Sequence, residues 1–196
     1  NEARKYRGKA LILCEGYMDV ISLHQAGFTN AVASLGTALT DGHAGILKRY
    51  TDNVIISYDS DGAGQDAALR AIPKLKNAGI SVKGANLSPY KDPDELIKAL
   101  GAPEYTERLN NATNGFLFEI QVLSRSFDLN DPDEKTRFGN ETANRLSYIE
   151  DDLERENYLE IFCRQYGFER DIITRIIRKR LLSSEGMKYI PLNRGE

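Results

Sequence analysis

The stretch VIISYDSDG, residues 54–62, joins an apolar run to two aspartates and a glycine. The run Val54–Tyr58 predicts a strand buried on both faces, as in a parallel sheet covered by helices. Residues two apart point to the same face of a strand, so Asp59 and Asp61 are expected to lie side by side. Because ligand sites in open α/β sheets lie at the carboxyl ends of the strands, this stretch predicts both a fold and a site.

The alternation of apolar runs and helical segments continues on both sides of this stretch. We expect strands at residues 10–14, 31–35, 54–58 and 80–87, and helices at 19–26, 41–50, 63–77 and 95–100. Pro73 is expected to kink or end the helix that contains it. Strands that alternate with helices favour parallel βαβ units, so the fold class is α/β, a parallel sheet flanked by helices.

The second half of the chain carries helical patterns in place of strands. Apolar residues recur at helical spacing within residues 116–123, 131–149, 159–162 and 172–181, which predicts a small all-α helical bundle. We expect residues 1–110 to form the α/β domain, residues 111–185 the helical bundle, and residues 186–196 a tail or linker.

Composition narrows the classes of function. The 196 residues are 41% hydrophobic and 28% charged, and no apolar run approaches the ~20 residues of a membrane span, so no membrane partner is expected. Two cysteines and two histidines argue against a zinc site and favour a reducing, cytoplasmic location. The net charge of −3 argues against an unaided nucleic-acid-binding module. The chain begins without Met and is expected to be part of a longer protein.

Acidic residues also follow the first expected strand. Glu15 comes directly after the apolar run, Gly16 permits a tight turn, and Asp19 lies near the start of a helix. Asp19 has an alternative explanation as a cap or as compensation of the helix dipole. Glu15 is harder to explain in this way, since a carboxylate at the end of a buried strand needs a partner.

The two aspartates of the opening stretch repel each other unless a cation lies between them. Gly62 and Gly64 then allow a sharp turn. The alternative is a polar loop in which Asp59 or Asp61 caps the next helix, and both explanations remain open from the residues alone.

A third acidic segment, Asp92-Pro93-Asp94-Glu95, follows the fourth expected strand. Asp, Pro and Glu in this order are also a helix-capping pattern, and the same tetrapeptide recurs at residues 131–134, where we expect no chemistry. Only the position after a strand favours a site at the first copy. Carboxylate oxygens from three segments favour two or more Mg²⁺ or Mn²⁺ ions and no zinc.

The motifs together resemble the bacterial DNA primase family over roughly residues 8–100. The matching segments are EGYMD at 15–19, ASLGT at 33–37, YDSDGAG at 58–64 and KDPDEL at 91–96. The resemblance implies a Toprim fold followed by the helical subdomain of the primase RNA polymerase core. It implies DNA-dependent RNA primer synthesis for replication, by nucleotidyl transfer at an acidic site that binds divalent metals.

The resemblance also implies a role for each matched residue. Glu15, Asp59 and Asp61 would be catalytic metal ligands, Glu15 being a ligand or a general acid/base. Asp92 and Asp94 would hold a further metal. The implied supporting residues are Asp19, Gly16, Gly62 and Gly64, and the implied phosphate or nucleotide contacts are Ser34, Gly36 and Thr37.

The implied partners are a single-stranded DNA template, ribonucleoside triphosphates and the RNA–DNA hybrid product. A replicative helicase would be reached through a domain outside this chain. The zinc module and basic subdomain of such primases are not seen here, so this part is expected to be weakly active or inactive alone. Two alternatives stay open, a Toprim nuclease that uses the same metals and a non-catalytic nucleic-acid-binding module.

Overall fold

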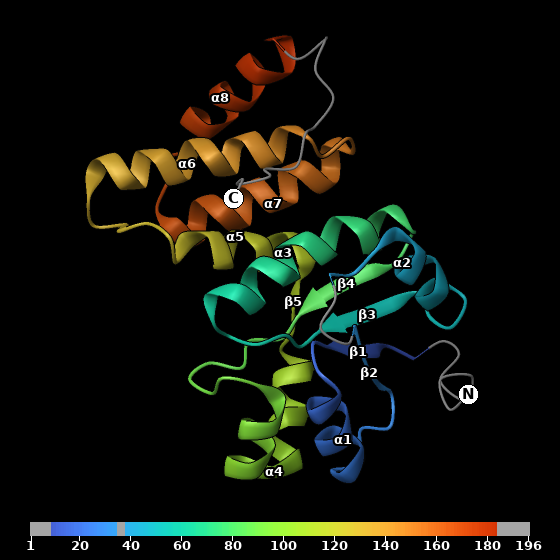
Figure 1. Ribbon diagram of the computed structural model, residues 1–196. Helices are drawn as coiled ribbons and strands as arrows, with labels where there is room; N and C mark the ends of the chain where they lie inside the picture. The colour runs from blue at the N-terminus through green and yellow to red at the C-terminus, as the bar shows by residue number, and fades with distance from the viewer. Residues whose placement is uncertain (1–8, 35–37, 184–196) are drawn as a thin grey trace. The chain divides into compact units, whose positions relative to one another are not determined.

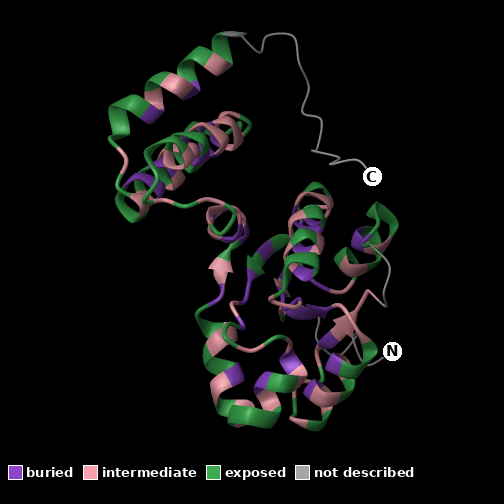
Figure 2. Ribbon diagram, turned by 60° about the vertical axis from the view of Figure 1, so that its left-hand side comes forward, coloured by how far each residue is buried: buried purple, intermediate pink, exposed green. Residues whose placement is uncertain are grey.

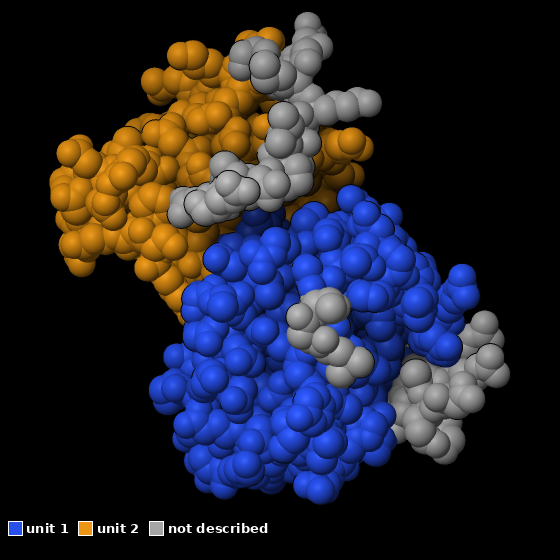
Figure 3. Space-filling model, in the orientation of Figure 1, with its two compact units in different colours: residues 1–119 blue, residues 120–196 orange. Residues whose placement is uncertain are grey.

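A computed structural model of the chain describes residues 9–34 and 38–183. The chain divides into two compact units, residues 1–119 and 120–196, which Figure 3 colours separately. The predicted α/β domain and the all-α part are both present, and each unit is described by itself below.

The first unit is built on a sheet of five strands in the order β2-β1-β3-β4-β5. The strands are β1 (Leu11–Cys14), β2 (Ala31–Ala33), β3 (Asn53–Ile56), β4 (Ser81–Gly84) and β5 (Thr113–Asn114). The first four pair in parallel as expected, whereas β5 is antiparallel to β4 and was not expected. Its two polar residues carry no apolar or alternating pattern that would have revealed a strand.

Helices cover both faces of this sheet. The helices are α1 (Tyr17–Gln25), α2 (Asp41–Lys48), α3 (Gly62–Asn77) and α4 (Pro93–Asn110). Figure 1 shows α1 and α4 on one face, and α2 and α3 on the other. Such a three-layer arrangement buries the strands on both sides, which Figure 2 shows as purple segments within the sheet.

Side chains alternate across β1 to fill the two apolar layers. Ile12 and Cys14 join a buried cluster with Leu23 of α1 and Leu96 of α4. Leu11 is as buried as Ile12, and its side chain points to the opposite face of the sheet from that of Ile12. Burial of each such side chain contributes roughly 2 kcal/mol to folding, so this layer fixes where the end of β1 lies.

Helix α3 ends at Asn77 as expected, and Pro73 lies inside it without ending it. Helix α4 differs from the expectation from sequence. Helix α4 extends ten residues beyond Leu100, with an interruption at Gly101, whose φ of 79° is favourable only for glycine. This extension carries Tyr105 into the core, where its hydroxyl donates to Ser57 Oγ at 2.9 Å.

The described residues of the second unit form helices joined by short turns, without a strand. Its helices are α6 (Pro132–Ser147), α7 (Asp152–Tyr166) and α8 (Arg170–Ser183), preceded by α5 (Gly115–Ser124), which crosses the division. Phe138 of α6 packs edge-on against Phe162 and Tyr166 of α7, with ring centroids 5.7 and 4.9 Å away. Across residues 9–34 and 38–183, no helix is both long and apolar enough to cross a bilayer.

Candidate metal centre

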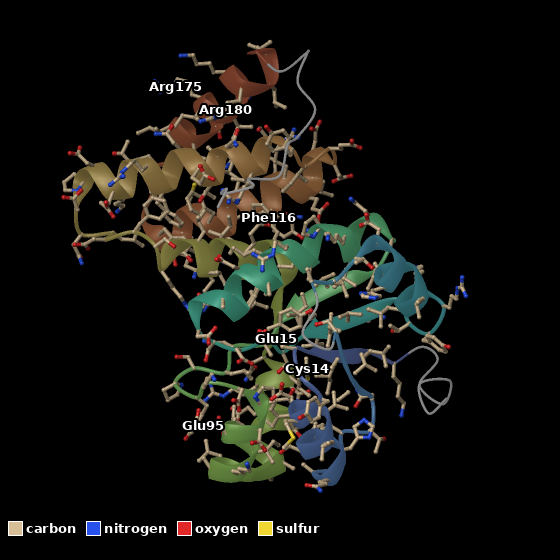
Figure 4. All side chains as sticks on the ribbon, in the orientation of Figure 1. Cys14, Glu15, Glu95, Phe116, Arg175 and Arg180 are labelled. Carbon is tan, nitrogen blue, oxygen red and sulfur yellow. The ribbon has the colours of Figure 1, made fainter. Side chains whose placement is uncertain are left out.

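The three acidic segments follow three adjacent strands. Glu15 comes directly after β1, where Figure 4 labels it beside Cys14, while Asp59 follows β3 and Asp92 follows β4. Since β1, β3 and β4 are neighbours and parallel, their carboxyl ends share one edge of the sheet. The structure therefore brings the three segments to one edge.

A direct hydrogen bond joins the first two segments. The backbone N–H of Asp59 donates to Glu15 Oε1 at 3.0 Å, and both residues are half-buried. Burial raises the pKa of Glu15, and the bond from Asp59 opposes that rise. The negative charges of Asp59, Asp61 and Asp19, in that order, raise the pKa of Glu15 further. A bound cation would relieve this repulsion.

Asp59 lies where the charges of the second and third segments overlap. Burial and then the charge of Asp92 raise its pKa, Lys91 lowers it, and Asp61 raises it. The negative charge of Asp92, after β4, thus acts on the carboxyl group of Asp59, after β3. This electrostatic coupling links the acidic segment after β3 to the one after β4.

Asp61 has the capping role that the residues alone left open. Its Oδ1 accepts the N–H of Gly64 at 2.8 Å and caps α3, and Asp61 is exposed. Capping and metal binding are compatible, because a carboxylate has a second oxygen and further lone pairs.

Asp92 caps α4 in the same way. Its Oδ1 accepts the N–H of Glu95 at 2.7 Å, so the capping pattern expected for this tetrapeptide is present. Asp94 pairs with Lys98 at 2.6 Å, and the bond from Lys98 lowers the pKa of Asp94. The third segment therefore offers Asp92 as the carboxylate coupled to Asp59, and Asp94 as one already held by a lysine.

Asp19 is the buried member of the acidic group. Only 7% of its surface is exposed, and its Oδ2 accepts the N–H of Gly16 at 3.2 Å. Burial raises its pKa to about 6, the Gly16 bond opposes the rise, and the charges of Asp59, Asp92 and Asp94 add to it. The charges that raise the pKa of Asp19 come from the second and third acidic segments, so Asp19 belongs to the same acidic group.

The three glycines of these motifs have different roles. A Cβ on Gly64 would lie 2.3 Å from the carbonyl oxygen of Asp59 and 2.5 Å from Glu15 Oε1, so only glycine fits there. Gly62 has open space around it, and none of Gly16, Gly62 and Gly64 has a positive φ. The chain bends at residues 15–16 and 60–61, beside Gly16 and Gly62, without a positive φ at either glycine, whereas Gly64 is needed for close approach.

The loop of residues 59–61 is tied to the segment before α4 by Ser60. The N–H of Ser60 donates to the carbonyl oxygen of Lys91 at 2.7 Å, and its hydroxyl contacts the same oxygen at 2.9 Å. The hydroxyl also contacts the carbonyl oxygen of Tyr90, and Gln65 Nε2 donates to the carbonyl oxygen of Ser60 at 2.6 Å. Sequence reasoning missed Ser60 and Gln65, since a serine between two aspartates carries no distinctive signal.

The expected phosphate contacts fall largely outside the structure. Gly36 and Thr37 lie outside the described residues. Ser34 is half-buried, and its N–H donates to the carbonyl oxygen of Cys14 at 3.2 Å. That amide is already used in the sheet, so a phosphate contact by Ser34 would have to come from its side chain.

The donor set suits Mg²⁺ or Mn²⁺. Within the described parts of the chain, no three Asp, Glu, His or Cys side chains are close enough together to hold a metal unaided. Mg²⁺ is commonly held by one or two carboxylates together with water and substrate phosphates. The carboxylates of Glu15, Asp59 and Asp92 could hold such an ion together with water or substrate oxygens.

Two families match the chain. Residues 12–97 match a family described as Toprim-like, and residues 116–171 match the DnaB-helicase binding domain of primase. The first match spans all the acidic segments and confirms the Toprim fold. The match of residues 116–171 contradicts our expectation that a helicase-binding domain would lie outside this chain.

Curated proteins that match the chain include DNA primases. The DNA primase of Clostridium acetobutylicum is 36% identical over 170 residues, which are 87% of this chain and 28% of that protein. The chain therefore spans less than a third of the length of this curated relative. The DNA primase of Aquifex aeolicus is 37% identical over 89% of this chain and 33% of its own length.

Solved structures extend the likeness beyond the first unit. The E. coli primase catalytic core has a TM-score of 0.66 and 32% identity, covering 85% of this chain and 55% of that one. Because residues 1–119 make up only about three fifths of the 196 residues, coverage of 85% must include helices of the second unit. The helical part thus resembles both a catalytic-core structure and a helicase-binding family.

Proposed function

Because the chain belongs to the bacterial DnaG-type primase family, we propose that its first unit is the catalytic, metal-binding part of an enzyme that synthesises RNA primers on single-stranded DNA. The observation that carries this proposal is the coupling of Glu15, Asp59 and Asp92 at the ends of three adjacent strands. Primase relatives favour primer synthesis over the nuclease and the non-catalytic alternatives.

The proposed reaction is attack of a primer 3′-hydroxyl on the α-phosphorus of a ribonucleoside triphosphate. A new bond forms between the 3′-oxygen and the α-phosphorus, the bond from the α-phosphorus to the bridging oxygen of the β-phosphate breaks, and pyrophosphate leaves. Bound Mg²⁺ or Mn²⁺ would activate the attacking oxygen and neutralise charge on the leaving group. The carboxylates of the chain would bind these metals and so orient the phosphates of the nucleotide.

Each carboxylate has a place in this scheme. Glu15 and Asp59 are held against each other by the bond from the Asp59 N–H, and we assign them, with Asp61, to the first metal site. Asp92, with Asp94 beside it, serves a further metal. Glu15 is assigned as a ligand of the first metal or, in place of that role, as the group that accepts the proton of the 3′-hydroxyl.

The helical part is assigned a contact with the replicative helicase. This assignment rests on the match of residues 116–171 to the helicase-binding family. Template DNA is proposed as a partner because a similar solved structure, with 31% identity, is a DnaG catalytic domain bound to single-stranded DNA. Ribonucleoside triphosphates, the RNA–DNA hybrid and a cytoplasmic location follow from primer synthesis, and belong to the proposal with it.

The test is primer synthesis by the full-length primase carrying Asp59→Asn and Asp61→Asn together. We expect template-directed ribonucleotide incorporation to be lost while the melting temperature stays unchanged or rises, because removing like charges relieves repulsion. Asp131→Asn, in the second copy of the tetrapeptide, is the control and should leave synthesis unchanged. Synthesis that survives the double substitution would contradict the proposal and favour a non-catalytic role.

A further inference from the structure

The sheet determines the position of the loop that bears Asp59 more closely than that of the loop that bears Asp92. Ile56 of β3 pairs with Gly84 of β4, and the carbonyl oxygen of Ile56 accepts the N–H of Ala85 at 2.8 Å. Asp59 follows Ile56 by three residues, whereas Asp92 follows Gly84 by eight. The register of the strands therefore determines the position of Asp59 closely and leaves that of Asp92 to other contacts.

Ser60 supplies those contacts between the loops. It lies between Asp59 and Asp61, and both its N–H and its hydroxyl reach the carbonyl oxygen of Lys91, at 2.7 and 2.9 Å. Lys91 directly precedes Asp92, so these bonds end one residue from the third acidic segment. The carbonyl oxygen of Tyr90 is a further contact of the Ser60 hydroxyl.

The loop that bears Ser60 is itself held in place. The Asp59 N–H is bonded to Glu15, the Asp61 carboxylate caps α3, and Gln65 donates to the carbonyl oxygen of Ser60. A side chain on such a loop can transmit a fixed position to the segment it contacts. The Lys91 N–H is bonded to Glu95 Oε2 at 2.6 Å, which joins the contacted segment to the start of α4.

We propose that Ser60 is a positioning residue whose hydroxyl sets the separation between the Asp59–Asp61 loop and Asp92, and thereby the joint binding of divalent cations by the two loops. The proposal rests on the proposed function, since it concerns the same acidic site. Ser60 itself is not assigned as a ligand. Its role depends on the hydroxyl, because alanine would keep the N–H bond to Lys91 and lose the second tie.

The experiment is a titration of the 196-residue chain with Mn²⁺ alone, following free Mn²⁺ by electron paramagnetic resonance. We expect Ser60→Ala to weaken binding of Mn²⁺ by about tenfold, the effect of one lost hydrogen bond. Ser60→Thr, which keeps a hydroxyl, should bind within about twofold of the unsubstituted chain on the same scale. Ser147→Ala removes a hydroxyl bonded to the carbonyl oxygen of Asn144 in α6, and should leave binding unchanged.

A second readout needs no metal. Amide hydrogen exchange in metal-free protein should be faster at residues 90–95 in Ser60→Ala, and ordinary in Ser60→Thr, because the tie to Lys91 is weakened only in the first. Unchanged exchange and unchanged Mn²⁺ binding in Ser60→Ala would overturn the role of Ser60. An unsubstituted chain that binds no Mn²⁺, or binds it equally after Asp59→Asn, would instead contradict the proposed function and the role of Ser60 with it.

Discussion

The tetrapeptide Asp-Pro-Asp-Glu occurs at residues 92–95 and again at 131–134, and the two copies have the same local structure in different surroundings. In each, the first aspartate caps a helix by accepting the N–H of the glutamate, at 2.7 Å for Asp92 and 2.8 Å for Asp131. In each, the glutamate accepts a backbone N–H from upstream, of Lys91 and of Asp128 respectively.

The two copies have different surroundings. The first copy follows a strand of the sheet and the residue Lys91, which is bonded to Ser60, and it raises the pKa of Asp59 through the charge of Asp92. The second follows a helix and a short turn in the helical unit, and its Glu134 pairs with Arg137. A local string therefore specifies a helix start, while the position of the string in the sheet decides whether its carboxylates meet others.

The largest expected difference between the copies is in activity. In the full-length primase, Asp92→Asn with Asp94→Asn should lower the rate of primer synthesis by about a hundredfold, the scale of losing metal support. Asn is itself a good cap, so the helix should remain. The matched double substitution of Asp131 and Asp133 should leave the rate within about twofold, the size of an ordinary surface change. Equal losses from both pairs would remove the functional distinction between the copies.

A substitution of Gly64 tests how closely the loop of Asp59 packs against Glu15. Gly64→Ala places a methyl group against backbone and carboxylate oxygens, and should lower the free energy of unfolding by roughly 2–4 kcal/mol. Gly62→Ala, two residues away and in open space, should change it by less than about 1 kcal/mol. Denaturant unfolding of both variants checks this pair. A tolerated Gly64→Ala would mean that the Asp59 loop and Glu15 are not in close contact.

Asp19 is expected to make the stability of the folded chain depend on pH. Its folded pKa of about 6 lies above the ordinary value of 3.8, so the folded state holds its proton more strongly than the unfolded state. Stability from this group is present below about pH 4 and is lost as pH rises toward 6. Relative to Asp19→Asn, the unsubstituted chain should lose about 2 kcal/mol between pH 4 and 7.

The check is urea unfolding of both proteins across this range in the presence of a chelator. Asn keeps an oxygen for the Gly16 N–H, so the comparison isolates the charge of Asp19. A stability difference that does not vary with pH would show that Asp19 is solvated as an ordinary carboxylate.

The smallest expected effect is the loss of the helix cap, which both copies of the tetrapeptide provide. Asp92→Ala and Asp131→Ala each remove a cap and should each lower the free energy of unfolding by about 1 kcal/mol. Thermal or denaturant unfolding of the two single variants measures this. A much larger loss at Asp131 than at Asp92 would indicate that the first copy is not a true cap.

The sequence allowed the sheet and the acidic segments to be predicted because these depend on local pattern. The apolar run before Asp59 predicts β3, and the strand order then brings its end beside those of β1 and β4. What could not be predicted depends on long-range packing. The two-residue β5 and the extension of α4 that buries Tyr105 are stabilised by partners distant in the chain.

The candidate site divides in the same way. Carboxylates at strand ends are visible in the sequence, and the motif resemblance gave each a role. The tie from Ser60 to Lys91 joins residues 31 apart in the sequence, and no pattern in either segment indicates it. The need for glycine at position 64 follows from a carbonyl oxygen and a carboxylate that meet there only in the folded chain.

Anomalous diffraction from crystals of the chain soaked in Mn²⁺, with and without a ribonucleoside triphosphate, tests the central distinction most directly. Peaks beside Glu15 and Asp59, with a further peak near Asp92 and none at Asp131 or Asp133, are the predicted result. Crystals with nucleotide bound but no peak at Glu15 and Asp59, or with equal peaks at both copies of the tetrapeptide, would contradict it.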